Sequence, residues 1–197
     1  MKKVYLIITI LLSILCLTGC KEASEEVLKE NMKKLELTGN LVTYQVYYHN
    51  VLEYEKKPGS GIEHWFEIKR MLFAEYTGTI KLGINLSKVK INVTGNTINV
   101  VIPKTTIIGE PNVDKNDFSP KNFIVSRDSW LNSNPITADD SAKAFDEAQQ
   151  SMKNSVLQDT ELLATAQKRA KILIEENINQ FSGMSKGSYT IKWEYEQ

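Results

Sequence analysis

The sequence predicts an α+β fold with a mostly antiparallel sheet. Three observations predict it: stretches that alternate with period two fill the first half of the chain, a long segment without Gly or Pro follows, and a last alternating stretch ends the chain. Strands first, helices late and a returning strand are typical of α+β domains. We therefore expect a β-hairpin, two C-terminal helices or one long kinked helix, and a C-terminal strand that returns to the sheet.

The N-terminus is predicted to be a lipoprotein signal peptide, residues 1–19. Two lysines precede the apolar stretch 4–17, which falls short of the roughly 20 residues that span a bilayer. Leu17-Thr18-Gly19-Cys20 follows and resembles the bacterial lipobox, in which the chain is cut between the residues at Gly19 and Cys20 and the cysteine carries a diacylglycerol. An ordinary cleaved secretory peptide and an uncleaved helix with a chance cysteine are the alternatives.

Charge and cysteine content exclude several classes of protein. The chain has 24 basic and 24 acidic residues and two cysteines, whereas nucleic-acid binders normally carry a basic excess. Cleavage before Cys20 would remove Lys2, Lys3 and Cys16, which leaves a net charge of 22 − 24 = −2 and one acylated cysteine. We therefore expect no nucleic-acid partner, no intramolecular disulfide and no thiol nucleophile.

Residues 20–39 are predicted to hold the anchor and a short helix, and residues 40–197 a single α+β domain. The helix, 24–38, begins at Ser24, which can cap it, and ends at Gly39. Its narrow apolar stripe consists of Val27, Leu28, Met32 and Leu35. The helix could lie near the membrane as a tether or pack on the domain, and the stripe favours packing because it needs a partner surface.

Two long strands are predicted over 41–54 and 72–86, because apolar and polar residues alternate in both. Residues 56–61 contain Pro58, Gly59 and Gly61 and break the first strand as a turn or flexible loop. Residues 62–71 are ambiguous, since apolar residues stand among charged ones, and either a short helix or an irregular flap fits.

A hairpin with a two-residue turn at Gly95-Asn96 is the most sharply defined prediction. Alternating residues on both sides set its register on one face: Val93 opposite Ile98, Ile91 opposite Val100 and Val89 opposite Ile102.

The region that follows is predicted as a long irregular segment and then helices. Residues 109–136 have no clear period, and the aromatic residues Phe118, Phe123 and Trp130 are expected to fix them to the domain. Thr137 with Asp140 predicts a capping box. One helix over 138–181 would be about 66 Å long, so we expect a break between Ser155 and Thr160, with a single projecting helix as the alternative.

The last strand is predicted from the alternation of four apolar or aromatic residues with polar ones: Tyr189, Ile191, Trp193 and Tyr195.

No motif for catalysis, a metal or a cofactor stands out, so we expect a protein that is not an enzyme and binds no cofactor. The only histidines, His49 and His64, are interpreted as surface residues. The acidic run at Asp114 lacks the spacing of a calcium loop. Six aromatic residues fall on predicted inward faces: Tyr44, Tyr48, Tyr54, Tyr76, Trp193 and Tyr195. They either fill the core or line a ligand groove. The candidates for a groove are Tyr44, Tyr48, Tyr76 and Trp193, together with Trp65 of the ambiguous segment.

Several stretches resemble one family of proteins. They are Leu41-Val42-Thr43, the run from Glu75 to Val89, Ile102-Pro103, Asn134-Pro135-Ile136-Thr137, and the alanines Ala164, Ala166 and Ala170. Residues 35–195 are thereby similar to the domain of unknown function 4230 family. The resemblance implies a bacterial membrane-anchored or exported protein, and it implies no catalytic residue.

Together these observations predict a lipid-anchored protein on the extracytoplasmic face of a bacterial membrane, attached through Cys20. Its expected role is non-enzymatic binding or assembly at the cell envelope, with an envelope protein or a second copy as partner. The alternative is a carrier of a lipid or another apolar ligand, with the aromatic sheet face as the groove and the Trp65 segment as its flap.

Overall fold

A computed structural model describes residues 25–35, 37–126, 134–183 and 189–196. The predicted signal peptide, Cys20 and Trp130 lie outside the described residues. The described residues form two compact units: unit 1 comprises those within 1–41, 84–104 and 167–197, and unit 2 comprises those within 42–83 and 105–166. The domain boundaries inferred from the sequence stay predictions, and each unit is described by itself.

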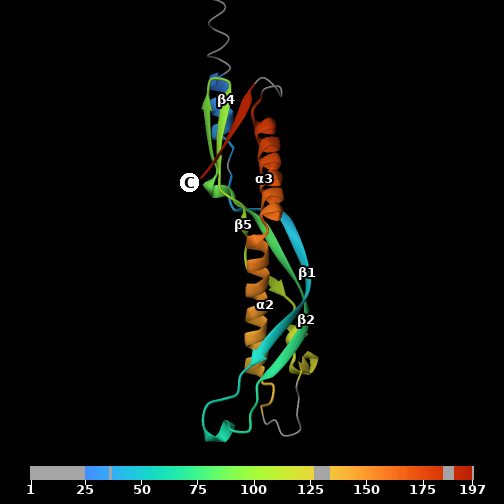
Figure 1. The fold of residues 1–197 in the computed structure, drawn as a ribbon. Coiled ribbons are helices and arrows are strands. Elements are labelled where there is room, and N and C mark those ends of the chain that lie inside the picture. Colours follow the sequence, from blue (N-terminus) through green and yellow to red (C-terminus); the bar gives the residue numbers. More distant parts are fainter. Residues whose placement is uncertain (1–24, 36, 127–133, 184–188, 197) are drawn as a thin grey trace, which may run out of the picture. The chain divides into compact units, whose positions relative to one another are not determined.

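Unit 2 is built on two long neighbouring strands, β1 (Asn40–Lys56) and β2 (Arg70–Asn85) (Figure 1). Three short strands pair antiparallel with β2: β5 (Thr106–Ile107), β6 (Asn112–Val113) and β7 (Ile124–Ser126). Because β2 receives all of these partners, it is the central strand of the sheet.

Two helices follow the irregular segment, as predicted. Helix α2 (Ala138–Gln158) begins with a complete capping box between Thr137 and Asp140. It ends at Asp159, and helix α3 (Thr160–Phe181) starts directly after it. The Asp159 carboxylate accepts a hydrogen bond from the Leu162 N–H at 2.9 Å, which satisfies a free donor in the first turn of α3. The predicted break is confirmed.

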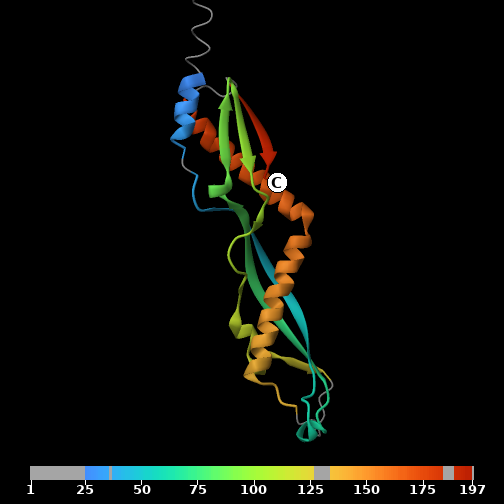
Figure 2. The same ribbon diagram turned by 90° about the vertical axis from the view of Figure 1, so that its left-hand side faces the viewer.

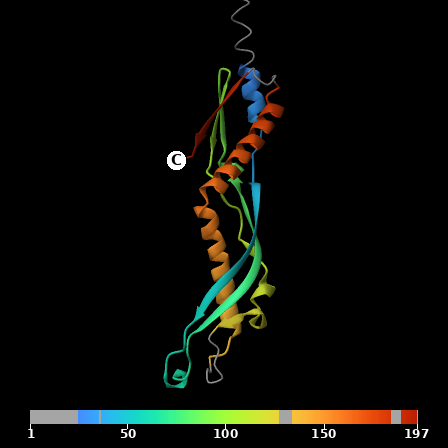
Figure 3. The same ribbon diagram turned by 45° about the vertical axis from the view of Figure 1, so that its right-hand side comes forward.

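Helix α2 packs on one face of the sheet of unit 2 (Figure 3). The inward residues of β2 are those that the alternation predicts, and Leu72, Ala74, Ile80 and Leu82 are fully buried. Small residues of α2 let the helix approach closely, and Met152 touches the position that a side chain at Gly78 would occupy. Gly78 is therefore needed for close packing of helix on strand.

The described part of the segment 109–136 is held by aromatic contacts. Within them lie β6, the 3-10 turns η3 (Lys115–Phe118) and η4 (Pro120–Asn122), and β7. Phe118 and Phe123 are buried, and the Phe118 ring lies 5.7 Å from that of Tyr76 and 5.7 Å from that of Phe145. These two phenylalanines fix the segment to the core, as expected.

Unit 1 holds a three-stranded sheet of β3 (Lys90–Thr94), β4 (Thr97–Ile102) and β8 (Thr190–Tyr195). Strands β3 and β4 form the predicted hairpin, with Val93 opposite Ile98 and Ile91 opposite Val100. Strand β3 starts at Lys90, so Val89 lies just outside the ladder. Strand β8 returns to the sheet as predicted and pairs parallel with β4.

The residues of α3 that belong to unit 1 pack on one face of this sheet, beside the helical residues 25–33 (Figure 2). Leu28 and Met32 of that short helix are buried in the same core as Ile98 and Ile174. Packing on the domain is therefore the alternative that the structure contains. The α+β fold is confirmed: β5, β6 and β7 pair antiparallel with β2 in unit 2, and the sheet of unit 1 has one antiparallel and one parallel pair.

Candidate binding surface

The sheet of unit 2 leaves one of its faces exposed, and we call this the outer face. It is defined by alternate residues of the two long strands, which are Tyr47, His49 and Val51 of β1 and Glu75, Thr77 and Thr79 of β2. The alternation that sends Tyr48 and Tyr76 into the core sends their neighbours outward. Tyr47 is 77% exposed and Val51 is 56% exposed, so aromatic and aliphatic surface is available for contact here.

Two adjoining hollows lie along this part of unit 2 and share Thr77. The first has a volume of about 550 Å³ and is lined by Tyr47, Tyr48, Thr77, Gly78, Thr79, Asn112, Val113, Asp114 and Lys115. The second has a volume of about 390 Å³ and is lined by His49, Glu75, Tyr76, Thr77, Asp117, Asn122 and Ile124. Hydroxyl, amide and charged groups line both hollows together with apolar side chains such as Val113 and Ile124, a mixture that suits a polar ligand or a polar segment of a partner.

Polar contacts hold the walls of the hollows in place. The Asp117 carboxylate accepts hydrogen bonds from the Thr77 N–H at 2.9 Å and from the Thr77 hydroxyl at 3.3 Å. The Asp114 carboxylate accepts from the Asn116 N–H and side-chain amide, each at 2.9 Å. These carboxylates order the segment that follows β6. Among the described residues, no group of three or more His, Cys, Asp and Glu could hold a metal ion.

Both histidines contact glutamates. His49 Nε2 lies 2.5 Å from Glu75 Oε1 on the outer face. His64 Nδ1 lies 2.8 Å from Glu67 Oε1 in the connection between β1 and β2. The hydrogen bond to Glu67 raises the pKa of His64 above its ordinary value. The Gly59 N–H and His64 in turn hold the pKa of Glu67 below its ordinary value.

The five aromatic residues predicted as a groove are not brought together. Tyr76 is 1% exposed and lies inside the core of unit 2, and burial raises the pKa of its hydroxyl. Tyr44 and Tyr48 pack against that same core, whereas Trp193 packs against the separate core of unit 1. Tyr195, also assigned to an inward face, is 50% exposed because it ends the edge strand β8, so that assignment is wrong.

Trp65 belongs to a second exposed surface, at the end of the β1–β2 hairpin. The ambiguous segment 62–71 forms one 3-10 turn, η1 (Ile62–His64), before β2 begins. Ile62, Trp65 and Phe66 are 82%, 81% and 82% exposed, and we call these three residues the apolar tip. Such exposure of large apolar side chains is uncommon in a monomeric protein and marks a candidate contact site.

In the part of the chain that the structure describes, no helix has both the length and the apolar character needed to cross a membrane.

One protein family matches the region of the chain that holds these surfaces. The model of a protein family of unknown function, DUF4230, matches residues 33–187. The chain belongs to the DUF4230 family. The resemblance drawn from the sequence is thereby confirmed for nearly the same residues. Neither the curated proteins nor the solved structures contain a match to the chain.

The DUF4230 region covers both hollows and the apolar tip. The sequence does not reveal the outer face, because the polar alternate residues of a strand look the same in a sequence whether they face solvent or a partner. Tyr47 and Val51 were the available signal, since both stand at positions where solvated strands usually carry polar residues. The apolar tip was visible in the sequence only as apolar residues without a period.

Proposed function

We propose that this DUF4230 protein is a lipid-anchored, extracytoplasmic binding or assembly module at the bacterial cell envelope, and that its outer face is the partner-binding surface. The observation that carries the proposal is the uncovered sheet face of unit 2, with two adjoining hollows that share Thr77. The lipobox run Leu17-Thr18-Gly19-Cys20 supports the attachment. Two acyl chains or more are needed for firm anchoring, and a diacylglycerol on Cys20 supplies two.

The attachment is tested by labelling cells with a clickable fatty acid and immunoprecipitating the protein. Wild type and the Cys16→Ala variant should carry the label, because Cys16 belongs to the predicted leader. Cys20→Ala should lose it completely. Label that persists in Cys20→Ala would contradict lipid attachment at this residue.

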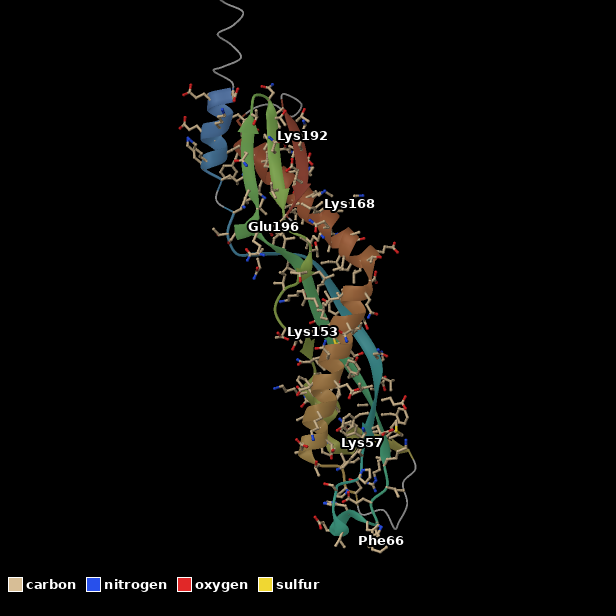
Figure 4. All side chains as sticks on the ribbon, turned by 60° about the vertical axis from the view of Figure 1, so that its left-hand side comes forward. Lys57, Phe66, Lys153, Lys168, Lys192 and Glu196 are labelled. Carbon is tan, nitrogen blue, oxygen red and sulfur yellow. The ribbon has the colours of Figure 1, made fainter. Side chains whose placement is uncertain are left out.

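Partner binding is tested by photo-crosslinking in intact cells. A photoreactive residue at position 47 on the outer face should give a discrete crosslinked product, either with an envelope protein or with a second copy of the chain. The same residue at position 168 on α3, which is also exposed (Figure 4), is the control and should not give that product. A protein that is monomeric and forms no product at position 47 would rule out this surface.

A carrier of a lipid or another apolar ligand is the second candidate. It rests on the aromatic residues named above, of which Tyr76 is buried and Trp193 packs in another core, so we place it behind the binding module. Native mass spectrometry of the freshly extracted protein tests it. A stoichiometric copurified lipid would favour the carrier over the binding module.

A further inference from the structure

The end of the β1–β2 hairpin is built to present apolar side chains to solvent. Figure 4 shows Phe66 at the far end of the hairpin, turned away from the rest of unit 2. The three residues of the apolar tip are each more than four-fifths exposed. None of them is needed to close the core of unit 2, whose buried members all lie elsewhere. Their exposure is therefore a property of the tip and not a by-product of packing.

The backbone of the tip is held in one conformation by a carboxylate. Glu67 accepts hydrogen bonds from the Gly59 N–H at 2.8 Å and from His64 at 2.8 Å. The His64 N–H donates to the Gly61 carbonyl at 3.1 Å, and the Glu67 N–H donates to the His64 carbonyl at 2.9 Å. A Cβ at Gly59 would stand 2.5 Å from the His64 ring, so this turn depends on glycine there.

The base of the tip is fastened to the first turn of α2 and to the residues before it. The buried Asn134 side chain donates to the Ile68 carbonyl at 3.2 Å. Lys56 donates to the Pro135 carbonyl at 2.5 Å and to the Asp140 carboxylate at 2.6 Å. A preorganised tip loses little conformational entropy when its side chains are buried by a partner.

We propose that the apolar tip inserts into the interfacial region of a lipid bilayer. Trp and Phe favour this region, where an amphipathic ring lies at the level of the headgroups. A convex tip with side chains this exposed has no walls of its own, and a bilayer can enclose it without a matching shape. A protein partner would need a pocket that fits all three side chains.

The charge of the tip identifies the kind of lipid surface. Residues 57–69 contain two basic residues, Lys57 and Lys69, and two acidic ones, Glu63 and Glu67, so their net charge is 2 − 2 = 0 with His64 neutral. Lys69 is also paired with Glu55 at 3.0 Å. Insertion is therefore driven by apolar contact, proceeds on zwitterionic lipid and changes little with salt, since no excess charge is screened.

The inference is tested with the full chain and vesicles of phosphatidylcholine whose acyl chains carry bromine, which quenches nearby tryptophan. The difference between wild type and Trp65→Phe isolates the fluorescence of Trp65 from the other two tryptophans. Brominated lipid is placed either in the vesicles that hold the protein or in vesicles added afterwards. Quenching of Trp65 is expected with at least one of the two placements of the brominated lipid, because the tip inserts either into the bilayer that holds the protein or into the bilayer of an added vesicle.

Two variants define the outcome. The double variant Ile62→Ser, Phe66→Ser keeps Trp65 and should need at least about tenfold more lipid for the same quenching, since each buried large apolar side chain contributes about that factor. The control Leu157→Ser, at a position 50% exposed on α2, should behave as wild type. Thermal unfolding checks that all variants are folded.

Three results would overturn the inference: no quenching of Trp65 in either arm, equal quenching of the double variant and wild type, or quenching that disappears at high salt. Absence of quenching combined with a protein crosslinked to position 66 in cells would assign the tip to a protein pocket. Because the quenching signal comes from Trp65 alone, it does not depend on acylation of Cys20 or on a partner at the outer face.

Discussion

The two hairpins of this protein close in opposite ways. Strands β3 and β4 are joined at Gly95-Asn96, with Thr94 paired to Thr97, so the turn exposes only polar or small residues. Strands β1 and β2 are joined by residues 57–69, which carry the apolar tip. The comparison indicates that a hairpin needs no apolar residue at its end for stability.

The largest expected difference lies between a core residue of the short hairpin and a tip residue of the long one. Ile98 is fully buried in β4, so Ile98→Ala should lower the free energy of unfolding by about 4 kcal/mol, from lost burial and a residual cavity. Trp65→Ala should change it by less than about 0.5 kcal/mol, as exposed substitutions usually do. Urea denaturation measures both. A Trp65→Ala loss as large as that of Ile98→Ala would show that the tip belongs to the fold.

The second comparison concerns two lysines that flank the tip. The side chains of the Lys56–Asp140 pair are 14% and 6% exposed. Burial alone would raise the pKa of the Asp140 carboxyl group, but the hydrogen bonds from Lys56 and Thr137 hold that pKa below its ordinary value. Lys56→Met leaves that buried carboxylate without its cation, which should cost about 3 kcal/mol.

The control for Lys56→Met is Lys69→Met, because the Lys69–Glu55 pair is 51% and 38% exposed. It should cost no more than about 1 kcal/mol, since solvent screens an exposed pair. Denaturant titration of both variants beside wild type measures the two losses. Equal losses would mean that Lys56 does not fasten the base of the tip.

The two hairpins also differ in how far the sequence predicts them. The register of β3–β4 follows from the sequence because the turn residues and the period-two alternation agree. The break at Asp159 follows from a capping residue and from the length limit of one helix. Both are local signals, and local signals suffice where the structure is set by neighbours in the chain.

The apolar tip and the outer face depend on contacts that local patterns do not contain. The tip is held by Asn134, far along the chain from Ile68, and by Glu67 across the turn. The burial of Phe118 depends on Tyr76 and Phe145, which belong to other elements. Tyr195 lies on the same side of its strand as Trp193 and is nevertheless exposed. The alternation of a strand does not show how far along it other elements pack on that side.

A glycine in the short turn gives the third prediction. Gly95 has φ of +57° and nothing lies within 4 Å of an added Cβ, so Gly95→Ala introduces backbone strain and no clash. The expected loss is about 1 kcal/mol. Gly95→Asn should lose less, because asparagine adopts this conformation more readily. Thermal unfolding of the three proteins gives the order, and a Gly95→Asn variant less stable than Gly95→Ala would contradict the strain argument.

The smallest expected effect is a change in the pKa of His64, which lies in the connection between β1 and β2. The pKa of His64 is raised mainly by its hydrogen bond to Glu67, and Glu63 adds a weaker attraction. NMR titration of the His64 ring should therefore show a midpoint that falls toward about 6.5 in Glu67→Gln and falls less in Glu63→Gln.

The sign of the pH dependence follows from both partners of this pair. A raised pKa of His64 stabilises the turn fully below the unfolded value of about 6.5, and this is lost as pH rises through the folded value. The lowered pKa of Glu67 stabilises the turn above the unfolded value of about 4.3, and this is lost as pH falls through the folded value. The turn should thus be most ordered between about pH 4.3 and 6.5. The protection factor of the Gly59 amide, which is its exchange corrected for the intrinsic pH dependence, should be largest in this window. A larger protection factor outside the window would contradict a turn held by Glu67 and His64.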